Sequence, residues 1–208
     1  MIGVILVLVT LLVLGVLPNS LNVLVVSGII SVISYKYRDF FKKSVIFYVI
    51  ALIVVGISVW FYQESWTYLI TKGIIGYGFI VVVMFVGVLP NKWTLSRNIK
   101  KNRGTYSILG FILISPHAIL RVFGVLGSVN IFGIAAYVIM IPLTIISFRV
   151  IRKEIDPKDW FMIQKAAYVI YGLLFIHLIV VAGYPDKIVY AVLLTLYVNN
   201  KLIKEFRK

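Results

Sequence analysis

The sequence predicts an all-α protein, a polytopic transmembrane helical bundle of about eight spans with both termini in the cytoplasm. Three observations support this fold class. Hydrophobic residues make up 62% of the 208 positions, the mean hydropathy is +1.04, and long apolar runs alternate with short basic segments. Uncharged runs of this length are typical of membrane-spanning helices. The runs take up almost the whole chain and leave no room for a soluble domain.

Each apolar run defines one expected span. The spans are 1–17, 20–35, 44–62, 67–89, 104–125, 130–148, 161–183 and 186–202. The first two are short for a bilayer that needs about 20 residues per helix, and they flank the turn signal Pro18-Asn19-Ser20. We therefore predict a transmembrane hairpin over residues 1–40, followed by a six-span core over 41–208. The N-terminus has no basic region or small-residue cleavage site, which predicts a retained span and no signal peptide.

The placement of basic residues determines the predicted orientation. They form four clusters: Lys36, Arg38, Lys42 and Lys43; Lys92, Arg97, Lys100, Lys101 and Arg103; Arg149, Arg152, Lys153, Lys158 and Lys165; and Lys201, Lys204, Arg207 and Lys208. Eight spans put all four clusters on one side, and the positive-inside rule assigns that side to the cytoplasm. We expect an integral protein of a bacterial or archaeal cytoplasmic membrane.

Several functional classes are excluded by residue content. The chain has no cysteine, which excludes iron–sulfur ligation, disulfides, thiolate catalysis and covalently attached haem. The net charge of +14 is explained by topology and anionic lipid, and no recognition module accompanies it, so nucleic acid is not an expected partner. No residue is placed as a nucleophile or general base, so no catalytic residue is predicted and any substrate chemistry would occur on a partner.

The only two histidines, His117 and His177, both fall within predicted spans. His117 lies 13 residues after Gly104 and His177 lies 12 after Lys165, on helices running in the same direction. At about 1.5 Å per residue, each is roughly 18–20 Å from the cytoplasmic end. Ionisable groups at membrane depth are functional candidates, and imidazole is a common haem ligand. The matched depth predicts one b-type haem with His117 and His177 as axial ligands of its iron.

Arg121 is a third candidate for the cofactor site. It follows His117 by four residues and shares its helix face, one turn nearer the outer surface. A guanidinium there would pair with haem propionates; the alternative is an arginine that extends to the outer membrane boundary. Lys72 is a weaker candidate for the same role. The histidines themselves have an alternative role as hydrogen-bonded packing or proton-relay residues, whereas two ligands are too few for a zinc site.

Two stretches carry a family resemblance. VGVLPNKWTLSRNIKKNRGTYSILGFILISPHAIL and the later helix with Trp160, Tyr168 and His177 in a Trp-x7-Tyr-x8-His spacing resemble the ferric reductase-like transmembrane domain family. The likeness covers about residues 67–200 and is greatest to the haem-binding membrane subunits of bacterial periplasmic methionine sulfoxide reductase systems.

The resemblance implies that His117 and His177 bind the outer haem. Family members often have further histidines about 13 residues earlier, where this chain has Gln164 on one helix and Arg103 or Gly104 on the other. A second, inner haem is therefore not expected. Larger family members carry a cytoplasmic flavin and nicotinamide domain, and this chain, ending at Lys208, has none.

These observations predict a haem protein that transfers electrons between a separate donor, a flavin reductase or a quinol, and a separate acceptor. Flavin or quinone would act through a partner, and the chain would be an electron-transfer subunit of an oxidoreductase system. The alternative is a haem-free polytopic protein, such as a small transporter or an assembly scaffold. We find no repeat between the two halves of the sequence, although transporters often have one.

Overall fold

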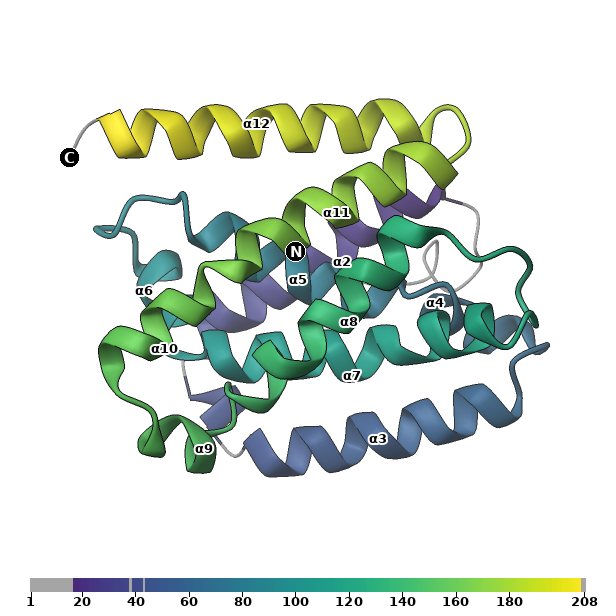
Figure 1. The fold of residues 1–208 in the computed structure, drawn as a ribbon, viewed down its shortest axis with the longest axis horizontal. Helices are drawn as coiled ribbons and strands as arrows, with labels where there is room; N and C mark the ends of the chain where they lie inside the picture. Colours follow the sequence, from purple (N-terminus) through teal and green to yellow (C-terminus); the bar gives the residue numbers. More distant parts are fainter. Residues whose placement is uncertain (1–16, 38, 43, 207–208) are drawn as a thin grey trace.

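The computed structural model describes residues 17–37, 39–42 and 44–206, and in these ranges the chain is helical with no strand (Figure 1). The α-helices are α2 (Asn19–Lys36), α3 (Ser44–Trp60), α4 (Tyr68–Thr71), α5 (Ile74–Val86), α6 (Thr94–Lys101), α7 (Arg103–Val122), α8 (Ile131–Ile145), α9 (Arg149–Glu154), α10 (Pro157–Gln164), α11 (Ala166–Val181) and α12 (Asp186–Phe206). Short 3₁₀ turns cover Phe40–Lys42 and Ser65–Thr67. The all-α prediction is confirmed for this part of the chain.

Each of the seven expected spans from residue 20 onward contains a long helix, and the expected span 1–17 lies almost wholly outside the described residues. Four helical segments in the described ranges are long and apolar enough to cross a membrane: Asn19–Lys36, Ser65–Val86, Arg103–Val122 and Pro157–Val181. Helices α3 and α8 are apolar but shorter. The protein therefore has the helices of an integral membrane protein, whereas the count of eight spans and the cytoplasmic termini stay predictions.

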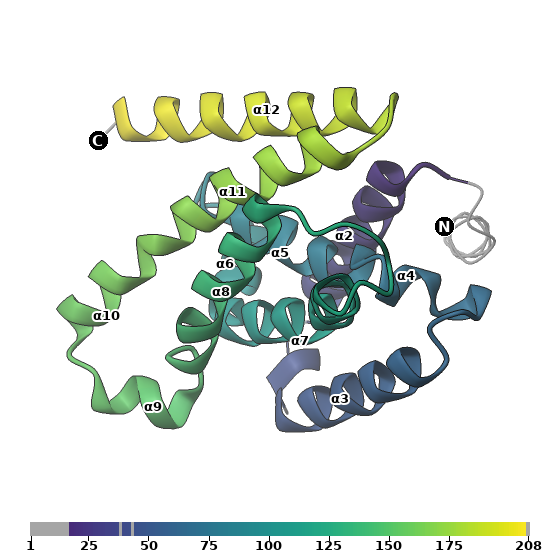
Figure 2. The same ribbon diagram turned by 45° about the vertical axis from the view of Figure 1, so that its right-hand side comes forward.

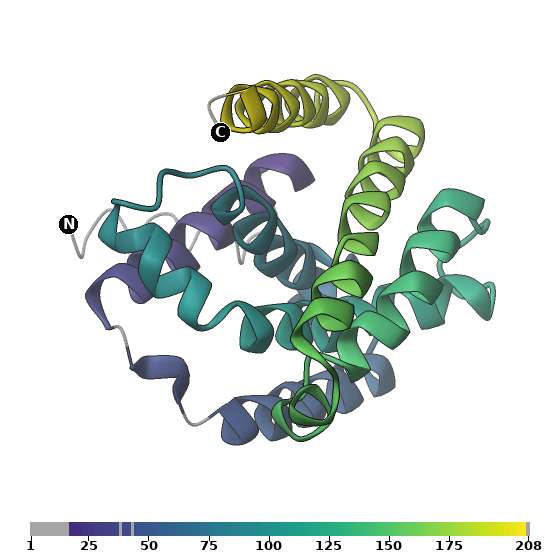
Figure 3. The same ribbon diagram turned by 60° about the vertical axis from the view of Figure 1, so that its left-hand side comes forward.

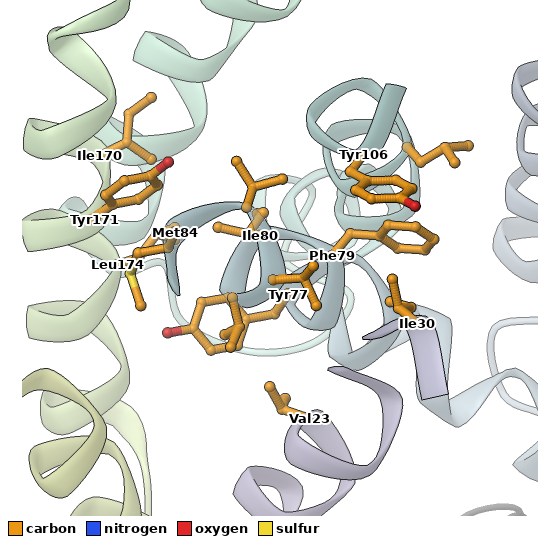
Figure 4. Close-up of a cluster of buried hydrophobic side chains, with 14 of the residues drawn as sticks. Val23, Ile30, Tyr77, Phe79, Ile80, Met84, Tyr106, Ile170, Tyr171 and Leu174 are labelled. Carbon is orange, nitrogen blue, oxygen red and sulfur yellow. The ribbon is translucent and has the colours of Figure 1, made fainter. Parts of the chain in front are cut away.

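Helix α5 lies at the centre of the bundle, packed against α2 on one side and α7 on another. It is apolar and nearly all its residues are buried, as expected of a helix surrounded by protein. Figure 4 shows side chains of α2, α7 and α11 gathered around it, including Val23, Tyr106 and Leu174. In all three ribbon views α12 and α3 lie on opposite sides of this core (Figures 1, 2 and 3).

Glycines set the close approach of α5 to its neighbours. A Cβ at Gly76 would lie 2.5 Å from the backbone nitrogen of Ile114 and 2.8 Å from the carbonyl oxygen of Gly110, both on α7. A Cβ at Gly78 would lie 2.5 Å from Cγ1 of Val26 on α2. Lipid tails are as apolar as leucine, so membrane helices associate through such close packing more than through the hydrophobic effect. Gly76 and Gly78 therefore allow α5 to pack closely against α7 and α2.

The outer surface of the bundle is apolar. Helix α3 exposes one branched aliphatic side chain after another, including Val45, Ile46 and Ile53, each more than half exposed. Helix α11 similarly exposes Val169 and Val180. A soluble protein rarely exposes contiguous apolar surface of this extent, so this surface fits contact with lipid.

The described parts of the basic clusters gather at one end of the bundle, the end that carries α6, α9 and the C-terminus in Figure 1. Lys101 of α6 forms an ion pair of 3.5 Å with Asp39 in the α2–α3 connection. Lys204 of α12 donates to the carbonyl oxygen of Gly87, 2.6 Å away. The pKa of Lys100 is lowered by burial, and then by the neighbouring charges of Lys204 and Arg103. This one-sided charge is the pattern from which the positive-inside rule predicts a cytoplasmic end.

Candidate functional site: a histidine pair between two long helices

The structure brings the two histidines together. His117 lies on α7 and His177 on α11, 60 residues apart in sequence, yet their ring centroids are 6.4 Å apart with an angle of 62° between the ring planes. Their matched depth in the sequence predicted this proximity. His117 lies near the end of α7 and His177 near the end of α11. In Figure 1 these helix ends lie away from the end of the bundle that carries α6, α9 and the C-terminus.

A break between α4 and α5 supplies the hydrogen-bond partner of His117. Gly73 adopts a left-handed conformation, with φ at 72°, that ends α4 and starts α5. In an uninterrupted helix the carbonyl of Thr71 would accept from the amide four residues later. Here it faces α7 and lies 3.1 Å from Nδ1 of His117. Glycine is required at this position because side chains disfavour positive φ, and an added Cβ would lie 3.2 Å from Cβ of His117.

The start of α8 positions His177. Asn130 is the N-cap of α8, and its Oδ1 accepts from the backbone amides of Phe132 and Gly133 at 3.0 and 3.2 Å, an arrangement that stabilises helix starts. The same oxygen lies 3.1 Å from Nδ1 of His177. A Cβ at Gly133 would lie 2.8 Å from that Nδ1. The imidazole therefore packs against the helix start only because residue 133 is glycine.

These contacts determine which nitrogen of each ring carries the proton. The Thr71 carbonyl can only accept, so His117 donates from Nδ1. Asn130 Oδ1 already accepts from two amides, and it therefore acts as an acceptor for Nδ1 of His177 as well. In a neutral imidazole with the proton on Nδ1, the lone pair is on Nε2. Metal-binding histidines commonly have this arrangement, with the second nitrogen held by a carbonyl oxygen.

The separation of the rings fits a metal held between them. Two Nε2 atoms on opposite sides of one metal, each about 2.0–2.1 Å from it, would place the ring centroids roughly 6 Å apart, and the centroids lie 6.4 Å apart in this structure. Within the described residues there is no group of three or more His, Cys, Asp or Glu side chains. A bare metal ion would therefore have only two protein ligands, whereas haem iron needs only two axial ligands because the porphyrin supplies the other four.

Arg121 lies in the last turn of α7 and is half-buried. Its guanidinium is within electrostatic range of both imidazoles, and the exposed Lys72 is within range of His117. Nη1 of Arg121 lies 3.2 Å from the position of a Cβ added at Gly127, whose φ is 92°. The predicted neighbourhood of Arg121 and the histidines is thus present, with the cation on the side away from the basic end.

Arg103 and Gln164, two of the positions at which the family that the sequence resembles often has further histidines, also come together. Arg103, at the start of α7, and Gln164, at the end of α10, line the same cavity of about 50 Å³ near the basic end of the bundle. Gly104 does not belong to that lining.

Comparison of the chain with protein-family models, with curated proteins and with solved structures finds no match. The resemblance therefore rests on the sequence stretches alone.

Three residues of this site were not among the sequence candidates: Thr71, Asn130 and Gly133. Asn130 carried a usable signal, because an asparagine directly before an apolar run is a typical N-cap. Thr71 acts through its backbone, so its side chain gave no indication. Gly133 matters only because α8 crosses α11 at that residue.

Proposed function

We propose that this chain is a membrane b-type haem protein that transfers electrons, with His117 and His177 as the axial ligands of the iron. The observation that carries the proposal is the pair of imidazoles 6.4 Å apart, each held at Nδ1. When bound, the haem supplies a one-electron ferrous–ferric couple. With His117 and His177 both bound to the iron, no position would be left for oxygen, which would favour electron transfer.

The chain's own residues hold and orient the ligands. The Thr71 carbonyl and Asn130 Oδ1 keep each ring in the tautomer that presents Nε2 and limit its rotation. Arg121 places a positive charge beside the pair, where it would bind propionates and favour the reduced state of the iron.

The remaining assignments belong to the same proposal. The chain is a member of the ferric reductase-like transmembrane domain family, spans a bacterial or archaeal cytoplasmic membrane eight times, and binds one haem. Electrons come from a separate flavin reductase or a quinol and leave to a separate acceptor. The apolar surface and the single basic end support the membrane orientation, and Arg103 and Gln164 at the inner positions support a single haem.

The visible absorption spectrum of the full chain, purified in detergent, tests this function. We expect a low-spin b-type spectrum and, by pyridine haemochrome titration, about one haem per polypeptide. His117→Ala or His177→Ala should each abolish the low-spin spectrum, because one axial position is left open. Gln164→Ala is the matched control and should leave it unchanged.

Two results would contradict the proposal. Absence of haem from protein isolated with haem supplied during expression would favour the haem-free transporter or scaffold. A stoichiometry near two would show that an inner haem binds without histidines at 103 and 164.

A further inference from the structure

The cavity near the basic end of the bundle has an unusual lining for a membrane protein interior. Its polar residues come from four helices that start or end near this level: Arg103 and Ser107 of α7, Thr144 of α8, Ser147 just after it, Gln164 of α10 and Tyr171 of α11. Apolar residues of α5, α8 and α11 close the rest. Chain segments far apart in sequence thus converge on one polar hollow.

The lining presents positive charge and hydrogen-bond donors, with no acidic residue among its members. The Tyr171 hydroxyl lies near the Arg103 guanidinium, but it is neutral and does not compensate the charge of Arg103. Nε2 of Gln164 is buried and has no hydrogen-bond partner. The buried, unsatisfied amide nitrogen of Gln164 costs free energy unless a ligand accepts from it. The half-buried Arg103 lines the same cavity.

The size of the cavity restricts that ligand. One water needs about 10–15 Å³ of such space, so the 50 Å³ here admits a small anion or a few waters. A porphyrin or a quinone ring is too large. The basic surroundings, including the Lys100 ammonium close to Arg103, would attract an anion from solution.

We propose that Arg103, Gln164 and the neighbouring hydroxyl groups form a binding site for a small monovalent anion of the size of chloride. The anion accepts from the Arg103 guanidinium and the Gln164 amide, and so links the start of α7 to the α10–α11 junction. The site is separate from the histidine pair, and this inference does not depend on haem binding.

Thermal unfolding of the full chain in detergent, followed by tryptophan fluorescence, tests the site. Sodium chloride replaces sodium gluconate at constant ionic strength, because gluconate is too large for the cavity. We expect a saturable rise in Tm with chloride. Arg103→Gln should weaken the apparent affinity about tenfold or more, and Gln164→Leu about two- to tenfold. Arg97→Gln is the matched control, since Arg97 is exposed on α6 and should leave the chloride response intact.

A second measurement uses the wild-type chain alone, so it decides the question even if Arg103→Gln does not fold. In crystals grown with bromide, anomalous scattering should place one bromide between Arg103 and Gln164. Equal chloride responses of Arg103→Gln and the wild type, or no bromide at this position, would overturn the site. A rise in Tm that needs phosphatidylglycerol and Arg103 but not chloride would also overturn it, because the ligand would then be a lipid headgroup.

Discussion

At the residue scale, the position of His177 on α11 depends on a glycine of α8, which has no Cβ. Gly133 leaves the space that the imidazole occupies, and Asn130, three residues earlier, holds its Nδ1. Helix α11 has a glycine of its own, Gly172, where an added Cβ would meet nothing within 4 Å. Gly133 therefore has a specific steric role, whereas Gly172 fits the general frequency of glycine in membrane helices.

Gly133→Ala should displace the His177 ring, because the new Cβ would lie 2.8 Å from Nδ1 in the present arrangement. We expect a marked loss of low-spin haem, measured by the ratio of haem to protein absorbance. Gly172→Ala should retain the wild-type ratio. Equal ratios for the two variants would show that α8 does not position the ligand.

Arg121→Gln removes the charge beside the histidines while keeping much of the side-chain length. The iron should keep both axial ligands, but the reduced state, which is more negative, loses a nearby cation. We therefore expect the midpoint potential to fall by tens of millivolts, since about 60 mV corresponds to 1.4 kcal/mol for one electron. Lys187→Gln, an exposed residue of α12, is the control in a redox titration. A potential unchanged from wild type would leave Arg121 as a boundary residue that extends to the membrane surface.

At the scale of elements, the contact of α5 with α7 determines how the histidine helix is held. The backbones touch at Gly76 and Gly110, and the break at Gly73, one turn earlier, turns the Thr71 carbonyl toward His117. Sequence patterning predicted one continuous span over 67–89, whereas the structure divides it into α4 and α5. In a continuous helix the Thr71 carbonyl would accept from a backbone amide of the same helix. Because the helix is divided, this carbonyl accepts from His117.

Gly76→Ala should destabilise the protein, since its Cβ would lie 2.5 Å from the Ile114 backbone nitrogen and backbone atoms cannot rotate away. Overpacking of this kind costs about 1–3 kcal/mol. Gly28→Ala, at an open position of α2, should be neutral or slightly stabilising, because alanine favours helix by up to about 1 kcal/mol. Thermal unfolding of the two variants measures the difference. A Tm for Gly76→Ala at or above that of Gly28→Ala would contradict the close crossing.

At the scale of the whole molecule, the separation of charge between the two ends predicts the orientation in the membrane. The chain contains no cysteine, so single cysteines can be introduced without a background. Tyr184→Cys lies in the exposed α11–α12 connection, and Lys158→Cys lies in α10 near the basic end. An impermeant maleimide applied to intact cells should label Tyr184→Cys only. Labelling of Lys158→Cys alone would show that the orientation is the reverse of the predicted one. Labelling of both variants would show that the protein does not have a single topology.

The sequence by itself predicted the fold class, the approximate positions of the seven long helices from residue 20 onward and the two candidate histidines, because apolar runs and rare ionisable residues are local signals. Their matched depth also predicted that His117 and His177 would meet. The tertiary structure alone decided what surrounds the two histidines: the Thr71 carbonyl, the side-chain oxygen of Asn130 and the space at Gly133. It likewise brought Arg103 and Gln164 to one cavity. These contacts depend on which residues face one another where helices cross, and helix crossing is set by packing between distant segments, which no local pattern records.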